Sequence, residues 1–268
     1  MGNEQAFERE LEIFRKDCES AAQCFYGHLA INEVGLRRPA VQRFLNRNAM
    51  FWNTAAGAMQ VATFMAMGRS FDQQSPHNVD RLMKLAQDDL AMFSHQALRR
   101  RKQGDALAPP SWLEEYMRNV YVPAPADFRR LRSHIKKHRR VYEANYRALR
   151  RKVYAHTEAT DDAEIQQLFS RTNKREIERL LLFLMRLYES MWHAFMNGRK
   201  PTLRPLPPSV SRSGRLTLPR TSLAGVHRRM TRDTEDLLVR AAAQQAAAPD
   251  GRRLSDRPRV SRRRWADR

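Results

Sequence analysis

The sequence predicts an all-α protein, an antiparallel multi-helix bundle with a disordered basic C-terminal tail. Apolar residues recur at steps of three and four over long segments, which is the spacing of one helix face. Short breaks rich in Gly and Pro separate these segments, and no segment alternates apolar and polar residues as a strand does. We therefore expect a helical domain over residues 1–198 and a basic tail over residues 199–268.

Six helices are expected in chain order. They span residues 3–32, 39–69, 76–101, 112–118, 125–156 and 173–197. Gly35 and Pro39 mark the first break, and Ser75 before Pro76 is typical of an N-cap followed by a first-turn proline. Thr172 or Asn173 is expected to cap the last helix, which Gly198 ends. A polar connection with a short apolar piece, residues 165–169, precedes that helix.

The second helix, residues 39–69, is apolar around most of its circumference. This pattern predicts a central place in the bundle. Its methionines and phenylalanines, including Met50 and Phe51, are then expected to pack in the core.

The charge balance indicates the class of partner. The chain carries 49 Lys and Arg against 29 Asp and Glu, a net charge of +20. Such an excess favours nucleic acid first and an anionic membrane surface second. The tail holds 18 basic and 6 acidic residues and seven of the 13 prolines, so disorder is expected outside a possible helix over residues 231–248. The tail is interpreted equally as a linker or as a nonspecific RNA-binding arm.

The two cysteines and the apolar segments indicate the compartment. Cys18 and Cys24 are six residues apart, about 240° around a helix, and are not expected to pair. No signal peptide and no membrane-spanning stretch is recognised. We expect a cytoplasmic protein without a membrane partner.

The long helix ends in a cation-flanked histidine. Its apolar stripe comprises Phe128, Leu131, Ile135, His138, Tyr142, Asn145, Leu149, Val153 and His156. Asn145 and His156 interrupt the stripe and point within about 20° of each other. A polar residue on a core-facing stripe must be satisfied there or serve chemistry. Arg150, Arg151 and Lys152 crowd the turn before His156.

The segment Leu-Arg-x-Lys-Val-Tyr-Ala-His, residues 149–156, carries a family resemblance. Together with a helical bundle of this length and Arg69 followed by Asp72, it resembles the HEPN superfamily of prokaryotic RNase toxins, in the abortive-infection branch. The resemblance covers residues 1 to about 198. That branch usually has Asp or Asn after the arginine, whereas this chain has Arg151. Arg150 and Arg151 therefore both fit the family position.

The resemblance implies a homodimeric, metal-independent endoribonuclease acting in defence or as a toxin, with an antitoxin protein as a possible partner. The chemistry is consistent with this, because a neutral His156 is suited to removing the proton of a ribose 2′-hydroxyl. Neighbouring cations are expected to lower its pKa, and a guanidinium, from Arg150 or Arg151, stabilises charge on the phosphate. The expected products are a 2′,3′-cyclic phosphate and a 5′-hydroxyl.

Substrate-binding candidates are Lys152, Tyr154 and Asn145, although core hydrogen bonding explains Tyr154 and Asn145 equally well. His156 alternatively only caps the helix C-terminus, where an imidazolium is favoured. His134 and His138 lack a third ligand nearby, so neither a metal nor another cofactor is expected. The main rival function is a non-catalytic helical module that binds nucleic acid or a partner protein. A membrane-surface protein is a third interpretation, based on charge alone.

Overall fold

The computed structural model describes residues 2–155, 161–203, 223 and 225–247, without the side chains of residues 154, 155 and 162. These residues form helices and connections, with no strand among them. The helices are α1 (Asn3–Arg37), α2 (Pro39–Arg47), α3 (Ala49–Phe71), α4 (Val79–Asp88), η1 (Leu90–Phe93), α5 (His95–Gln103), α6 (Leu113–Arg118), α7 (Pro125–Asn145), α8 (Arg147–Leu149), η2 (Arg150–Ala155), α9 (Asp162–Ser170), α10 (Lys174–Asn197) and α11 (Val226–Ala247). The predicted all-α antiparallel bundle is confirmed.

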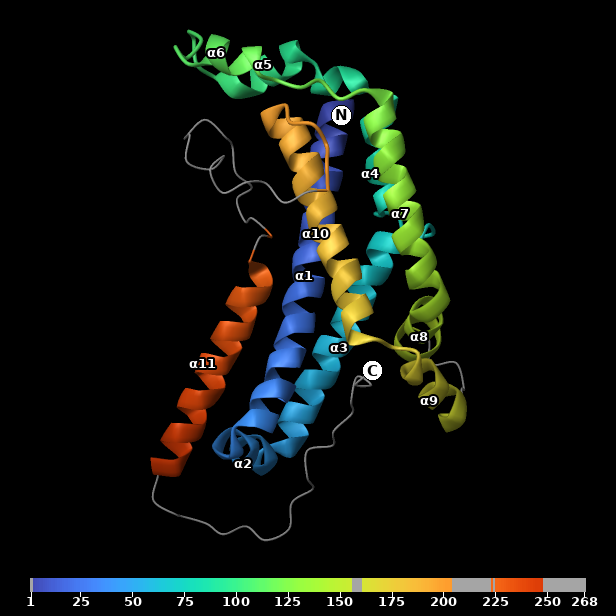
Figure 1. The fold of residues 1–268 in the computed structure, drawn as a ribbon, viewed down its shortest axis with the longest axis vertical. Coiled ribbons are helices and arrows are strands. Elements are labelled where there is room, and N and C mark those ends of the chain that lie inside the picture. Colours follow the sequence, from blue (N-terminus) through green and yellow to red (C-terminus); the bar gives the residue numbers. More distant parts are fainter. Residues whose placement is uncertain (1, 156–160, 204–222, 224, 248–268) are drawn as a thin grey trace.

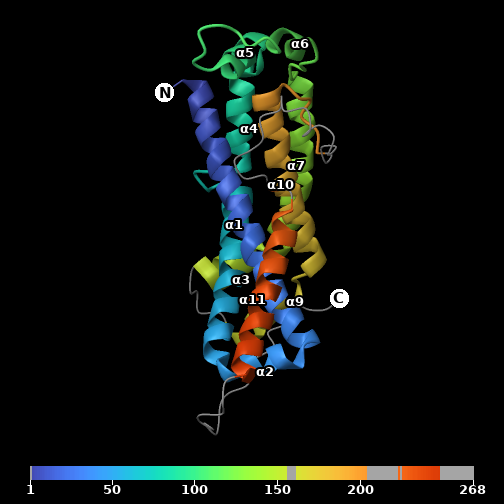
Figure 2. The same ribbon diagram turned by 90° about the vertical axis from the view of Figure 1, so that its left-hand side faces the viewer.

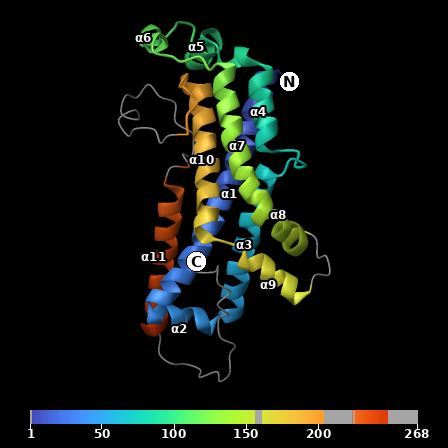
Figure 3. The same cartoon turned by 45° about the vertical axis from the view of Figure 1, so that its right-hand side comes forward.

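The bundle is elongated, and its long helices run alternately up and down (Figure 1). Helix α1 descends from the N-terminus, α3 and α4 return along one side, α7 descends beside α4, and α10 rises next to α1 (Figures 1 and 3). Helices α5 and α6 cross one end of the bundle, and α2 lies at the other. The short helices α8 and α9 project beside α3, where α7 ends (Figure 3).

One core cluster connects α1, α3, α4, α7 and α10. The stripe predicted for the long helix is buried in α7 and α8 at the five positions Phe128, Leu131, Ile135, Tyr142 and Leu149. At the start of α10, Asn173 accepts backbone N–H groups of the first turn and is therefore the cap, rather than Thr172, the other predicted candidate. At its end, Gly198 has φ 55°, a left-handed conformation that favours glycine.

Several breaks differ from the prediction, and at Asn78 and Asp89 the reason is a short polar side chain that accepts a nearby backbone N–H. Helix α1 continues through Gly35, where an added Cβ would lie 2.9 Å from Leu45, so the glycine permits close packing with α2. The expected second helix is divided at Asn48, which leaves helical backbone angles. Asn78, rather than Ser75, caps α4. The expected third helix is interrupted at Asp89, whose carboxylate accepts a backbone N–H.

The long helix does not run unbroken to residue 156. Tyr146 leaves helical geometry with φ −122°, and the chain then forms α8 and the π-helical segment η2. Tyr146 is fully buried, and its hydroxyl lies 3.4 Å from the carbonyl oxygen of Asn173, with which it hydrogen-bonds. The aromatic ring is therefore fixed against the start of α10, and the regular α-helix ends at this residue.

The first half of α3 is at the surface, so the expected central position of the second helix is wrong for this part. Met50 is 80% exposed and Phe51 is 63% exposed. A Cβ added at Gly57 would meet no atom within 4 Å. The apolar composition of this helix segment therefore leaves an open apolar face in the described chain.

Helix α11 lies along α1 and α2 (Figure 2). Leu238 and Ala242 are buried there with residues of α1 and α2 in a separate apolar cluster. The possible helix over residues 231–248 thus forms, begins five residues earlier, and packs on the bundle; residues 204–222 and 248–268 of the tail lie outside the description. None of the described helices combines the length and apolarity that a bilayer crossing requires.

Candidate active site beside the end of the long helix

Arg150 of η2 lies across α3 at Gly68. A Cβ added to Gly68 would be 2.3 Å from Arg150 Cδ and 2.4 Å from its Nε, so only glycine leaves room for this side chain. Arg150 Nη1 donates a hydrogen bond of 2.7 Å to Asp72 Oδ2. The two side chains are only 16% and 10% exposed. This charge pair fixes η2 onto the end of α3.

The electrostatics of the pair favour the charged forms. Burial raises the pKa of Asp72, but hydrogen bonds from the Gln74 backbone N–H and from Arg150 outweigh it and hold the pKa below its ordinary value. Burial raises the pKa of Tyr142 to about 12, and the nearby Arg150 cation opposes part of this rise. Asp72 is therefore an anion and Tyr142 a neutral phenol at physiological pH.

Arg151 differs sharply from its neighbour. Its side chain is exposed, and no hydrogen bond or ion pair joins it to any residue in the described ranges. An arginine without such a partner keeps its full hydrogen-bonding capacity for a ligand. The two arginines that fit the family spacing thus occupy different environments.

The other sequence candidates are distributed around this point. Lys152 forms an ion pair with Glu164 of α9. The amide of Asn145 donates a 2.8 Å hydrogen bond to Glu176, in the first turn of α10. His156 lies outside the described residues, and so does the side chain of Tyr154.

Sequence reasoning did not anticipate the partner of Arg150. Asp72 was noted only with Arg69 in the family resemblance, yet Arg69 points elsewhere and pairs with Asp17 at 2.6 Å. Gly68 was not singled out at all. A signal was available, because Gly68 and Asp72 are four residues apart and share one helix face.

His134 and His138 lie one turn apart on α7. The His138 ring stacks on Phe183 at 3.8 Å between centroids, and its Nδ1 lies 2.8 Å from the His134 carbonyl oxygen. Burial lowers the pKa of His138. Within the described ranges, no three His, Cys, Asp or Glu side chains are grouped as ligands.

Comparison with protein families gives a match to the HEPN family described as AbiU2, over residues 4–213. The matched range covers more than half of the chain and contains α2 to α10, nearly all of α1, and the segment 149–156. Helix α11 lies beyond it. Neither the curated proteins nor the solved structures provide a match.

Proposed function

We propose a reaction for this chain from one premise, that it belongs to the AbiU2 family of HEPN proteins, which is tied to abortive infection. The reaction is metal-independent cleavage of RNA in the cytoplasm, as a toxin in bacterial defence. It gives a 2′,3′-cyclic phosphate and a 5′-hydroxyl. The rest of the proposal assigns roles to the residues of η2 and the histidine that follows.

The observation that carries the proposal is the different placement of Arg150 and Arg151. Arg150 is held by Asp72, whereas Arg151 is exposed without a described partner. We assign Arg151 to the substrate, where its guanidinium contacts the phosphate and stabilises the charge that develops during attack. Arg150 is a positioning residue that anchors the segment from which His156 continues.

We assign the proton-transfer role to His156. As a general base it removes the proton of the ribose 2′-hydroxyl, and the oxygen then attacks the adjacent phosphorus. The bond from phosphorus to the 5′-oxygen breaks, this oxygen leaves as a hydroxyl after taking up a proton from water, and His156 afterwards returns its proton to water. The 2′-hydroxyl is required, so RNA is a substrate and DNA is not.

The open face of α3 supports a homodimer. At 100° per residue, Met50, Val61 and Gly68 lie within about 20° of one another, so the apolar face continues to the place where Arg150 rests. Thr54 on the same face donates to the Met50 carbonyl oxygen at 2.8 Å, which leaves its hydroxyl satisfied. A chain of net charge +20 repels its own copy, and an uncharged face permits approach.

We place a second copy of the chain on this face. In a two-fold dimer the same patch meets itself, so an apolar, uncharged face is self-complementary. A two-fold axis along α3 places both η2 segments at the same end of the interface. The two candidate sites then adjoin each other.

Replacing Met50 by glutamate is expected to convert the dimer to a monomer, because Met50 is 80% exposed on this face and two buried carboxylates would face each other across the axis. Light scattering coupled to gel filtration measures the mass. Leu107→Glu is the matched control, since Leu107 is a fully exposed leucine in the connection before α6. The interface is wrong if the parent is already monomeric, or if Met50→Glu keeps the parent's mass.

The reaction is tested with purified protein, labelled RNA and excess EDTA. We expect cleavage to continue in EDTA and the 5′ fragments to carry a cyclic phosphate, which mass spectrometry detects. RNA with a 2′-O-methyl group at the cleaved nucleotide should remain intact. Binding of RNA without cleavage would instead identify the non-catalytic helical module, and restoration of cleavage only by a divalent cation would exclude the proposed reaction.

A further inference from the structure

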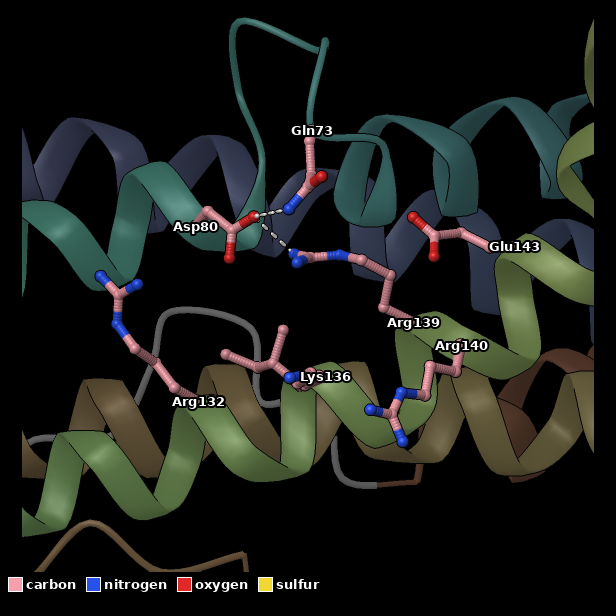
Figure 4. Close-up of a pocket in the computed structure, with 8 residues that line it drawn as sticks. Gln73, Asp80, Arg132, Lys136, Arg139, Arg140 and Glu143 are labelled. Carbon is pink, nitrogen blue, oxygen red and sulfur yellow. Dashed lines mark hydrogen bonds and ion pairs between the residues drawn. The ribbon is translucent and has the colours of Figure 1, made fainter.

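We infer that a groove between α4 and α7 binds the phosphate backbone of the RNA substrate beside the cleavage site, which deepens the proposed function and rests on it. The groove encloses about 440 Å³ and is partly open to solvent. The polar residues that line it are Gln73, Asp80, Arg132, Lys136, Arg139, Arg140 and Glu143 (Figure 4). Four of these seven side chains are cationic and two are anionic.

Arg139 and Asp80 form the fixed floor of the groove. Arg139 is 8% exposed, and its Nη2 lies 2.7 Å from Asp80 Oδ2. Its Nε donates to the Phe71 carbonyl oxygen at 3.1 Å, and the Gln73 amide donates to Asp80 at 3.4 Å. Figure 4 shows these three side chains meeting between the helices. Because Arg139 neutralises Asp80, the floor does not repel an anion.

Lys136 and Arg140 supply the charge available to a ligand. Both are exposed, and neither has a hydrogen bond or ion pair within the described part of the chain. They are one helical turn apart on the same face, about 6 Å along the axis. Arg132, a turn earlier, donates through Nε to Gln87 at 2.5 Å, which leaves its terminal nitrogens available. The row can contact successive phosphates of one strand.

The groove adjoins the candidate active site through two of its chain segments. Gln73 follows directly after Asp72, the carboxylate that holds Arg150. The helix that carries Lys136 and Arg140 leads into α8 and η2 (Figure 3). Glu143 lines the groove at its end toward α8, so we expect the strand to leave the α7 surface there and pass to Arg151.

The lining favours a nucleic acid over an acidic protein. Ile135 is the apolar residue in the wall, and it is already buried in the core. A protein partner draws much of its affinity from apolar side chains that bury together, and this groove offers little surface for them. A phosphate backbone needs charge alone.

The test compares two neighbouring lysines of α7. Lys136 lines the groove, whereas Lys137 is equally exposed but lies about 100° around the helix and does not. Both Lys136→Glu and Lys137→Glu are made in the His156→Ala background, so that the RNA probe stays intact. The probe is a short fluorescein-labelled single-stranded RNA, and anisotropy measures its affinity over a range of salt concentrations.

We expect Lys136→Glu to weaken binding about tenfold and to lower the salt slope by about one. Lys137→Glu should change affinity less than twofold. Equal weakening by both variants would overturn the inference, because bulk charge would then explain it. Poly-glutamate that displaces the RNA and shows the same dependence on Lys136 would also overturn it, in favour of an acidic protein.

The two proposals fail separately. Selective weakening by Lys136→Glu supports the groove even if the protein with His156 intact does not cleave RNA, and the proposed reaction alone is then rejected. Cleavage by the parent, with Lys136→Glu binding as tightly as Lys137→Glu, rejects the groove and leaves the reaction standing.

Discussion

Replacing His156 by alanine is expected to lower the rate of RNA cleavage about a thousandfold, because a general base contributes roughly two to four orders of magnitude. RNA binding should remain, since affinity for a polyanion derives mainly from Lys and Arg. Single-turnover cleavage with enzyme in excess measures the chemical step, and anisotropy with the labelled RNA measures binding. A joint loss of both would indicate unfolding rather than chemistry, and circular dichroism checks this.

His134→Ala is the matched control for this loss. His134 is exposed on α7 and follows Arg129 with four intervening residues, the same spacing that separates Arg151 from His156. Its substitution should leave cleavage within about twofold of the parent, as surface changes away from a site are usually mild. If His134→Ala were as damaging as His156→Ala, the assignment of the base to the helix end would be wrong.

The fold class could be predicted because it depends on periodicity. The stripe from Phe128 to Leu149 specifies a buried face wherever its helix is placed, and Asn173 and Gly198 mark ends through their own side chain or backbone. The breaks at Asp89 and Tyr146 were not predictable in this way. The break at Asp89 uses a local contact, since its carboxylate accepts the N–H of Ala91, but many aspartates inside helices make no such break. The break at Tyr146 depends on a partner that the tertiary structure supplies, the start of α10.

The exposed half of α3 shows the limit of composition as a guide. Apolar residues all around a helix indicate that the helix is buried, but not whether the same chain or a second molecule covers it. Met50 and Phe51 fit a core in sequence, yet in the structure they face outward. The proposed second copy would bury these side chains. Sequence composition alone does not distinguish burial in the core of one chain from burial between two chains.

The candidate site was predictable only as a segment. The run from Arg150 to His156 identified η2 and the histidine after it. That Arg150 is held in an ion pair while Arg151 is exposed became visible only when the structure placed η2 against the end of α3. Gly68 and Asp72 are about 80 residues away from Arg150 in sequence. Gly68 leaves room for the Arg150 side chain, and Asp72 accepts its hydrogen bond. The spacing of Gly68 and Asp72 places both on one face of α3, but one sequence does not show that Arg150 is the residue that contacts this face.

Arg151→Ala is expected to lower the rate of cleavage without changing stability, whereas Arg150→Met is expected to lower stability. Arg151→Ala should lower cleavage about a hundredfold, the usual effect of removing one group that stabilises developing charge. Its free energy of unfolding should stay within about 0.5 kcal/mol of the parent, since the side chain is exposed. Urea denaturation and single-turnover cleavage, measured on the same preparations, give the two quantities.

Arg150→Met should destabilise the fold by about 2 kcal/mol at neutral pH, because it leaves the nearly buried Asp72 anion without its guanidinium. In the parent, the pKa of Asp72 is below its ordinary value, so the stability it contributes is present above about pH 4 and is lost as the pH falls through the folded-state pKa. The difference between Arg150→Met and the parent should therefore shrink in acid. A difference that stays constant with pH would show that Arg150 acts through packing on Gly68. A variant as stable as the parent that has lost cleavage would make Arg150, not Arg151, the residue that contacts the phosphate.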